Sequence, residues 1–441
     1  MSGLVPPPIL AVPVELGQHI LSFCHPWDVA AFAQTCHAAY TLVYHPTDHY
    51  LWRQLYVTQF DVPKLSTSPS LSMQEKFEWK KELTSRMKVE LVLFHGPASQ
   101  AQTKGIYETL ITVIEESCCI KTNASASQSR NFKWLKRVIL NSQLLSNLYS
   151  QTGSEENAEL HARLRSHLAM TLEDKGDKQA FKLLLDRRDK SRAFVYDLRN
   201  YQPQNKWGPF KTDGSVNWIH VEHLIDVISL NIRELPGSWA STRPPSILDV
   251  HKRPLMLSAD VGSANDWAGV EGTWRRYVCF MDYRDLYAFN FTDLADGPRH
   301  PKFFKEPFRE ATRLIEVKLR LVPAYNMRFH SIPDDDNVLD QFSRFPPLAF
   351  SGTSKGVNGN EAAVEGYVVM GKDGILRWQL TSIYDNHPQW SSTGVQIGGP
   401  KSGMGIVGVW TTTHHDQDDP VGPFWLWKVE DDSPTHLMEF T

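Results

Sequence analysis

The first sixty residues alternate between short apolar stripes and breaks, which predicts a group of short helices. Pro13 suits the first turn of a helix, because its missing N–H costs nothing there. Leu16, Ile20 and Phe23 follow at spacings of four and three residues, which places them on one helical face. Two more stripes follow the breaks at Pro26 and His45-Pro46: Val29, Phe32, Ala33 and Cys36, and then Leu51, Trp52, Leu55 and Tyr56. A helical unit of this size is marginal alone, so we expect its apolar surface to dock another protein.

The middle of the chain, residues 96–240, repeats apolar positions at helical spacing and predicts amphipathic helices. Three of the stripes are Ile106, Leu110, Ile111 and Ile114, then Leu160, Leu164, Leu168 and Leu172, and then Ile225, Ile228, Ile232 and Leu235. The Ser- and Pro-rich residues 61–76 predict a linker, and a charged helix follows up to about residue 95. The aromatic segment 207–220 carries turn signals, and we expect its rings to anchor it to a core rather than to line a groove.

From about residue 255 the pattern changes from helical spacing to alternation. Apolar residues from Ile315 to Leu321 alternate with charged ones, which predicts a half-buried strand. Residues 371–374, Gly-Lys-Asp-Gly, predict a hairpin turn, and a second hairpin is predicted around residues 282–285, joining residues 274–280 to residues 286–291. A series of such short antiparallel strands predicts a closed barrel or a sandwich. Glycines within the strands favour the barrel, since its corners require them.

Composition narrows the choice of partners. Lys plus Arg number 46 and Asp plus Glu number 50, a net charge of −4, which indicates neither nucleic-acid binding nor binding to an anionic membrane. No apolar run approaches the length of a membrane helix, and the beginning of the chain does not have the pattern of a secretory signal. The five cysteines form no CxxC pair, so we expect reduced thiols and a cytoplasmic or nuclear location, or both.

Two polar motifs contain groups that could bind a phosphate or a metal ion, and neither predicts a catalytic site. The glycine-rich residues 398–405 lack the GxxxxGK[ST] order of a phosphate loop, and we expect a barrel hairpin there. His414, Asp416 and Asp418 would share one face of a strand and could bind a divalent ion, but a polar loop before Pro420 explains them equally well. No Ser/His/Asp or Cys/His arrangement stands out. We therefore expect no catalytic residues, no metal ion and no cofactor in this chain.

The N-terminal residues resemble the F-box family. The resemblance rests on Val12-Pro13-x-Glu15-Leu16, Ile20-Leu21-Ser22-Phe23, Pro26-x-Asp28-Val29, Thr35-Cys36 and Leu51-Trp52-Arg53-x-Leu55, in that order and spacing. Cys24 stands where leucine is usual, and Ala39 stands near the usual tryptophan. The charged helix that follows the linker and the aromatic segment 207–220 are similar to segments of large fungal F-box proteins, which implies a helical middle and a C-terminal β domain. The fold expected is α+β, with an F-box at 8–60, a linker and extension helix at 61–95, a helical domain at 96–250 and an antiparallel β-barrel or sandwich at 255–430.

The resemblance implies a substrate-receptor subunit of a Skp1–cullin–F-box type ubiquitin ligase. The F-box would bind a Skp1-type adaptor and through it a cullin–RING ligase, while ubiquitin transfer would occur on other subunits. The residues expected to shape or supply the adaptor surface are Pro13, Leu16, Ile20, Phe23, Val29, Trp52 and Leu55. The β domain would recruit a protein substrate.

Substrate binding is expected at the mouth of the barrel, because aromatic residues and arginine dominate binding hot spots. The candidates are Trp274, Arg275, Arg276, Tyr283, Arg284, Trp378 and Trp410, and a role in the barrel core is an equal alternative for each. Gly272-x-Trp274 is also similar to the start of lipocalin-type barrels, in which a tryptophan closes one end and an apolar ligand enters the other. Two alternatives therefore stay open: a lipocalin-like barrel that binds a small ligand, and an adaptor-bound scaffold outside any ligase.

Overall fold

The computed structural model of the chain describes most of the sequence between residues 12 and 440. The described residues are 12–46, 48–62, 77–96, 100–117, 129–150, 157–171, 176–235, 242–250, 266–292, 299–330, 332, 345–431, 435 and 437–440. They divide into two units, one of Met1–Val113 with Gln128–Leu144 and one of Ile114–Ser127 with Leu145–Thr441. Most of the predicted linker at 61–76 lies outside the described residues, as does Leu172. The predicted domain boundaries therefore remain predictions.

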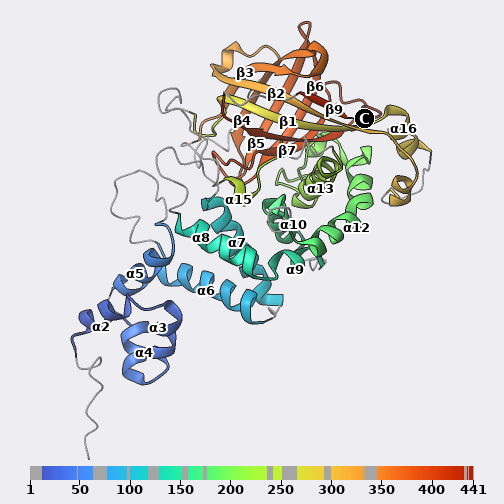
Figure 1. The fold of residues 1–441 in the computed structure, drawn as a ribbon. Helices are drawn as coiled ribbons and strands as arrows, with labels where there is room; N and C mark the ends of the chain where they lie inside the picture. The colour runs from blue at the N-terminus through green and yellow to red at the C-terminus, as the bar shows by residue number, and fades with distance from the viewer. Residues whose placement is uncertain are drawn as a thin grey trace, which may run out of the picture. The chain divides into compact units, whose positions relative to one another are not determined.

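Four short helices open the first unit: α2 (Val14–Leu21), α3 (Pro26–Ala33), α4 (His37–Tyr44) and α5 (Tyr50–Gln59) (Figure 1). Local chemistry sets two of their starts. The His25 side chain accepts the Trp27 N–H before α3, where Pro26 takes the first position, and the Cys36 side chain accepts the Ala39 N–H before α4. The helices bury a small core whose members share an exposure of 3% or less: Leu21, Val29, Ala33, Ala39, Val43, Leu51, Leu55 and Tyr56.

Two longer helices support the end of α5, namely α6 (Trp79–His95) and α8 (Arg130–Asn141). The buried Arg86 of α6 lies over the rings of Tyr56, at 5.0 Å, and Phe60, at 4.6 Å, and donates to Asn131 Oδ1 at 3.0 Å. Glu90 of α6 accepts the Trp134 Nε1–H of α8 at 2.5 Å. These contacts fasten α5 to helices that lie outside the F-box pattern. A further helix, α7, spans Gln100–Ser117.

The helical middle region of the second unit contains α9 (Leu144–Ser150), α10 (Ala158–His167), α12 (Lys178–Val195), α13 (Trp218–Glu234) and α15 (Ile247–Val250). The central helix is α13, which contacts α10 and α12 and also the strands β1, β7 and β8. Thirteen of its seventeen residues are buried, which explains why its apolar pattern is the densest in this region. The predicted helical middle is confirmed.

A closed antiparallel barrel of eight strands follows. Its strands are β1 (Gly272–Met281), β2 (Glu310–Val322), β3 (Leu348–Lys355), β4 (Glu361–Met370), β5 (Leu376–Tyr384), β6 (His387–Gln396), β7 (Ile406–Thr412) and β8 (Gly422–Lys428). Each strand pairs with the next along the chain, and β8 pairs with β1 to close the ring (Figure 1). A short ninth strand, β9 (Met438–Phe440), pairs with β2. The barrel is thus confirmed over the sandwich, with the 371–374 turn between β4 and β5 and residues 398–405 between β6 and β7.

One predicted hairpin is wrong. Residues 286–291 do not form a strand, because Tyr283–Phe291 is the helix α16, and β1 pairs with β2 and β8 instead. The Asp282 side chain caps α16 by accepting the Arg284 N–H at 2.9 Å, and Asp285 lies in its first turn. Leu286, Phe289 and Asn290 are buried at spacings of three and four residues, the period of a helix. The polar residues 282–285 are therefore a helix start and not a turn.

The barrel interior is filled at one end. Trp274 and Trp378 lie edge to face at 5.5 Å, and Phe350 packs on Trp378 at 5.6 Å. The Trp274 and Trp378 indole N–H groups donate to Val270 O, at 2.9 Å, and to Gln396 Oε1, at 3.0 Å. Ala268 and Val270, which precede β1, belong to the same buried cluster. This end of the barrel is closed by its own core.

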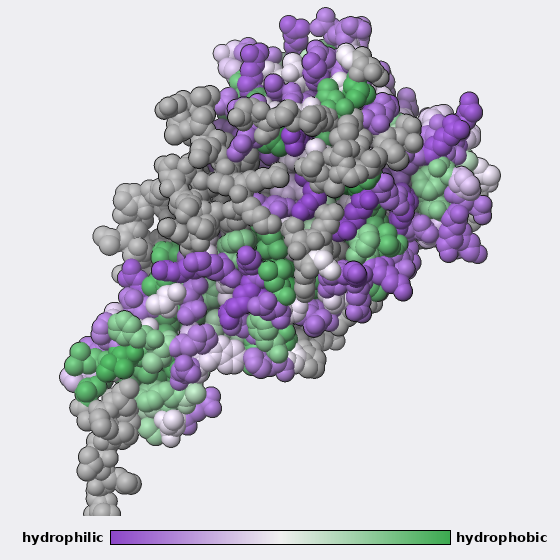
Figure 2. Space-filling view, in the orientation of Figure 1, coloured by the Kyte–Doolittle hydropathy of each residue, from purple (hydrophilic) through white to green (hydrophobic). Residues whose placement is uncertain are grey.

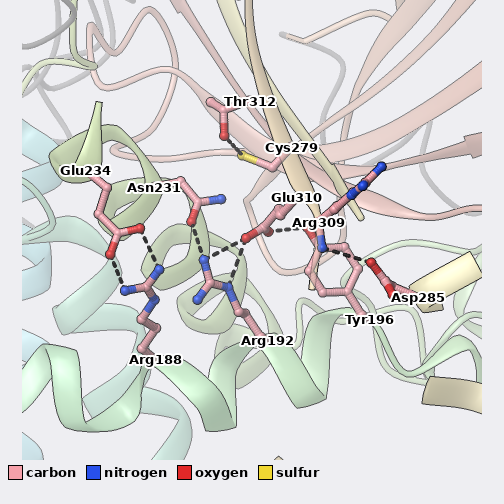
Figure 3. A network of polar contacts seen from close by, with 10 residues as sticks. All are labelled: Arg188, Arg192, Tyr196, Asn231, Glu234, Cys279, Asp285, Arg309, Glu310 and Thr312. Carbon is pink, nitrogen blue, oxygen red and sulfur yellow. Dashed lines mark hydrogen bonds and ion pairs between the residues drawn. The ribbon is translucent and has the colours of Figure 1, made fainter. Parts of the chain in front are cut away.

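A buried polar network joins the helices to the outside of the barrel (Figure 3). Arg192 of α12 forms an ion pair with Glu310 of β2 at 2.6 Å, and both side chains are about 95% buried. Arg192 Nη2 also donates to Asn231 Oδ1 of α13 at 2.8 Å, and the Tyr196 hydroxyl donates to Glu310. Cys279 of β1 lies beside Thr312 at 3.6 Å. The network sets the position of α12 and α13 on β1 and β2.

Candidate functional site

The helix α2 presents an apolar face that nothing in the described part of the chain covers. The exposed fractions are 53% for Val14, 54% for Leu16, 47% for Ile20 and 79% for Phe23. Figure 2 shows a hydrophobic area on the surface of the N-terminal helices. Leu16 and Ile20 are four residues apart, so they lie above one another on the helix. Large apolar side chains gathered in this way on a surface typically mark a protein–protein contact.

Local contacts hold this face in place. His19 Nδ1 and the Tyr50 hydroxyl form a hydrogen bond at 2.8 Å, which joins α2 to the start of α5. The Phe23 ring stands edge to face on the His19 ring, with 5.0 Å between centroids. The exposed Phe23 is therefore positioned by an aromatic neighbour and does not depend on a core.

The seven predicted adaptor residues fall into two groups. Pro13, Leu16, Ile20 and Phe23 are exposed, and they supply the surface. Val29, Trp52 and Leu55 are 1%, 8% and 0% exposed, so they support the surface from the core behind it. Tyr44 packs on Trp52 at 5.7 Å, and the Lys80 ammonium of α6 lies 5.5 Å from the Trp52 ring.

The second candidate site is the barrel interior beyond its closed end, where Arg276 lies. Arg276 is 6% exposed, and its side chain runs inside the barrel from β1 over the Phe424 ring of β8, at 4.5 Å. Its Nη2 donates to Ser392 Oγ of β6 at 2.7 Å, and its Nε has no hydrogen-bond partner among the residues that the structure describes. In the described part of the chain no carboxylate forms an ion pair with it. Burial lowers the pKa of the Arg276 guanidinium to about 10, which leaves it charged at neutral pH.

Aromatic side chains line the interior on the side of Arg276 that faces away from the closed end. The Trp410 ring stands edge to face with Trp390 at 5.3 Å and with Phe280 at 6.3 Å. Trp410 Nε1 donates to Cys279 O of β1 at 3.0 Å, across β8. That path needs Gly422, because a Cβ there would lie 2.7 Å from Trp410 Nε1. Trp390, Trp410 and Phe280 are all only partly buried.

The predicted substrate residues are only partly brought together. Arg276 and Trp410 share the barrel interior, and Tyr283 and Arg284 are exposed at the start of α16, directly after the Phe280 end of β1. The Tyr283 hydroxyl donates to Asp418 at 3.5 Å, on the β7–β8 connection. Trp274 and Trp378 are instead part of the closed end, and Arg275 is buried on the outer face of β1.

Sequence reasoning did not identify four residues that shape this interior: Phe280, Trp390, Ser392 and Phe424. Phe280 could have been found from the sequence, because it lies at every second position with Trp274, Arg276 and Val278 and so shares their face of β1. The others needed the strand register, which sets Trp410 opposite Ser392 and Phe424 opposite Val278.

The polar motifs weighed for chemistry do not assemble a metal site. In the described residues no group of three or more His, Cys, Asp or Glu could hold a metal ion. The His415 ring stacks on Trp207 at 3.9 Å, and Asp419 accepts the Asp416 N–H at 2.7 Å. The segment 207–220 is anchored as predicted, with Phe210 and Trp218 buried. None of the helices in the described residues is long and apolar enough to cross a membrane.

A hollow of about 650 Å³ lies between α12 and residues 299–301, on the outside of the barrel. Its lining includes Lys190, Phe194, Asp197, Arg199, His223 and His300. Arg199 forms an ion pair with Asp197 at 2.7 Å, and burial lowers the pKa of His223 to about 3, so the hollow is less positive than its composition indicates.

Comparison with known proteins identifies the N-terminal helices. Residues 9–58 match the F-box-like family model, a range that contains α2 to α4 and nearly all of α5. Searches of curated proteins and of solved structures returned no match. The match covers the exposed face of α2 and the core behind it, and it does not extend to the helical region or the barrel.

Proposed function

The chain is an F-box protein, and from this we propose that it is the substrate-receptor subunit of a Skp1–cullin–F-box type ubiquitin ligase. The F-box docks a Skp1-type adaptor, and the barrel recruits a protein substrate. The chain itself is non-catalytic and contributes proximity and orientation to a reaction on other subunits. This role places the protein in the cytoplasm, the nucleus or both.

The observation that carries the adaptor half of the proposal is the exposed face of α2. About half of the surface of Leu16 and of Ile20 is exposed, although both are large apolar side chains. Covering them with a partner removes apolar area from water, which is the main favourable term in association. The core residues Val29, Trp52 and Leu55 keep α2 in the orientation that this contact needs.

The test is co-purification of the full chain with a Skp1-type adaptor. The double variant Leu16→Asp, Ile20→Asp places two charges in the contact, and we expect it to lose adaptor binding by at least a hundredfold. The matched control is Leu91→Asp, Leu185→Asp, which makes the same change at two exposed leucines outside the F-box match. The control should bind as the wild type does. Undiminished adaptor binding by Leu16→Asp, Ile20→Asp would refute the assignment.

The receptor half of the proposal is supported by the barrel interior. A cation without an acidic partner in the described ranges and three partly buried aromatic rings lie together there: Arg276, Phe280, Trp390 and Trp410. Affinity capture of the full chain with its adaptor, with and without proteasome inhibition, should enrich proteins whose amounts rise under inhibition. Substitution of Trp410 by alanine should lower their recovery while adaptor binding is unchanged.

A small-ligand barrel is the second candidate for the β domain. The observation in its favour is the closed ring of eight consecutive strands with Trp274 in the closed end. Native mass spectrometry of the full chain tests it, because a bound apolar molecule would be retained with the protein and would be lost from Trp410→Ala.

A further inference from the structure

We propose that the barrel interior binds a singly charged carboxylate, held by Arg276 and Ser392, with the apolar part of the ligand directed toward Phe280, Trp390 and Trp410. The inference deepens the proposed receptor role and rests on it for the biological source of the ligand. It concerns a chemical group: the carboxylate belongs either to the end of a protein chain or to a free organic acid with an apolar body.

The charge of Arg276 is unpaired within the described residues. Arg276 is almost fully buried, yet in the described residues it has one side-chain hydrogen bond, to Ser392, and no ion pair. The Nε–H has no acceptor. Buried charges are usually paired with an opposite charge, because taking them out of water is costly. Another buried arginine of this unit, Arg192, has such a partner in Glu310.

The Arg276 guanidinium lies inside the barrel and reaches a strand that is not next to its own. Arg276 starts on β1 and reaches Ser392 on β6, and β8 and β7 lie between these two strands in the ring. The closed end lies on one side of it. On the other side the interior face carries small side chains, which the register places opposite core residues: Ser354 opposite Val317, Ser382 opposite Val364, and Ser392 opposite Leu380.

The donor groups of Arg276 and Ser392 indicate which kind of anion the site binds. A guanidinium donates two parallel hydrogen bonds to a planar carboxylate, and the Nε–H is the donor that lacks an acceptor. The Ser392 hydroxyl can donate a further hydrogen bond. A doubly charged phosphate would need a second free cation. The next arginine along the interior face, Arg313 on β2, is already paired with Glu439 at 2.5 Å and lies over the Phe280 ring.

The side chains beyond Arg276 indicate the chemistry of the rest of the ligand. From Arg276 outward the interior offers Val278 and then the rings of Phe280, Trp390 and Trp410, which are partly buried and arranged edge to face. These rings are surfaces for apolar or aromatic groups, and the charge beside Phe280, that of Arg313, is paired with Glu439. The site therefore fits an anionic head at the inner end with an apolar stem behind it.

The experiment uses the full chain and two pairs of probes that differ only in charge. One pair is a mixed pool of short peptides with free C-terminal carboxylates and the same pool with C-terminal amides. The other pair is decanoate and decanol. Binding is measured by affinity selection with mass spectrometry. We expect the wild type to retain the acid of at least one pair about ten- to a hundredfold better than its neutral twin.

The variants assign that preference to Arg276. Arg276→Met should abolish it, whereas Arg320→Met, which removes an exposed arginine on the outer face of β2, should keep it. The pair that shows the preference identifies the source of the carboxylate. Equal retention of acid and neutral twin by the wild type, retention of neither, or a preference that survives in Arg276→Met would overturn the inference.

A stability measurement separates a ligand site from a structural arginine. Replacing a buried unpaired charge with an apolar side chain of similar length is often neutral or stabilising. Arg276→Met should therefore melt at or above the wild-type temperature, and a clearly lower melting temperature would contradict the proposal. Adaptor capture distinguishes the two proposals, because Arg276→Met should still bind the adaptor while Leu16→Asp, Ile20→Asp should still prefer the acid.

Discussion

At the scale of single residues, burial decides which side chains are charged. His220 of α13 is buried beside Tyr201, His223 is partly buried against Phe194, and removal from water lowers the pKa of each to about 3. Burial also raises the pKa of Asp226, one turn along the helix from His223, to about 6. Ser191 joins the two, since its hydroxyl lies 3.0 Å from His223 Nδ1 and 3.0 Å from Asp226.

These pKa shifts predict a loss of stability on mild acidification. Below pH 6.5 the histidines of the unfolded chain take up protons that the folded chain excludes, so the free energy of unfolding falls as the pH falls. Asp226 opposes this between pH 6 and 4, because there the folded chain holds a proton that the unfolded chain has lost. Burial also lowers the pKa of His161 of α10 to about 3, so three histidines stand against one carboxyl, and we expect a net loss of about 2.7 kcal/mol per pH unit in that range.

Urea unfolding at pH 7, 6 and 5 measures this dependence. The variant His220→Gln should show a weaker pH dependence than the wild type, and His414→Gln, at an exposed position, should show the same dependence. A free energy of unfolding that does not change between pH 7 and 5 would contradict the prediction.

The same scale shows the limit of sequence reasoning about the site. Alternation along β1 could place Arg276 on the face of Trp274 and Arg275 on the other, but it could not say which face is the interior. Likewise, Leu16 and Val29 both belong to apolar stripes, and only the packing of α2 to α5 distinguishes the exposed residue from the buried one. Tertiary contacts hold that information, which local spacing does not.

At the scale of elements, ion pairs of unequal burial connect α12 to its neighbours. Arg192 pairs with Glu310, which is 6% exposed, while Arg188, one turn earlier, pairs with Glu234, which is 49% exposed (Figure 3). Removing one partner of a buried pair leaves an uncompensated charge, whereas an exposed pair contributes little because water screens it. The two pairs therefore provide a matched comparison on one helix.

We expect Arg192→Met to lower the free energy of unfolding by about 3–5 kcal/mol and Arg188→Met to lower it by less than about 1 kcal/mol. The double variant Arg192→Met, Glu310→Leu should recover most of the loss, since it removes both charges. Chemical denaturation of the four proteins measures the effect. Equal losses in the two single variants would show that α12 is not held by the buried pair.

Local signals predicted elements well wherever two signals agreed. The Gly-Lys-Asp-Gly turn lies between two apolar stretches, and β4 and β5 form there as expected. Residues 282–285, Asp-Tyr-Arg-Asp, were ambiguous, because Asp282 can start a turn or cap a helix. The burial of Leu286 and Phe289 against α12 and residues 303–304 decides that Asp282 caps a helix, and the local sequence does not contain that contact.

At the scale of the molecule, the chain has two units with separate cores. Leu55 is fully buried in the first unit, among the helices α2 to α6, and Leu376 is fully buried in the barrel. Since each unit buries its own apolar side chains, a cavity in one core should not weaken the other.

Hydrogen exchange read by mass spectrometry tests this independence. Leu55→Ala should destabilise its unit by about 2–5 kcal/mol and accelerate exchange in α5 and α6, with the strands unchanged. Leu376→Ala should do the reverse, with faster exchange in β4, β5 and β6. Faster exchange throughout the chain in either variant would indicate one cooperative unit.

The order of the strands also determines how the barrel can assemble. Within the eight-stranded ring, every pairing but one joins strands that follow each other in the sequence, so most of the ring can grow by adding hairpins whose contacts are local. The pairing of β8 with β1 joins the two ends of the domain, so forming it costs the loop-closure entropy of the whole segment between these strands. We therefore expect this pairing to form last during folding. Until it does, the edges of β1 and β8, with Tyr277 and Trp425 opposite each other, are the strand edges at which newly made chains are most open to aggregation.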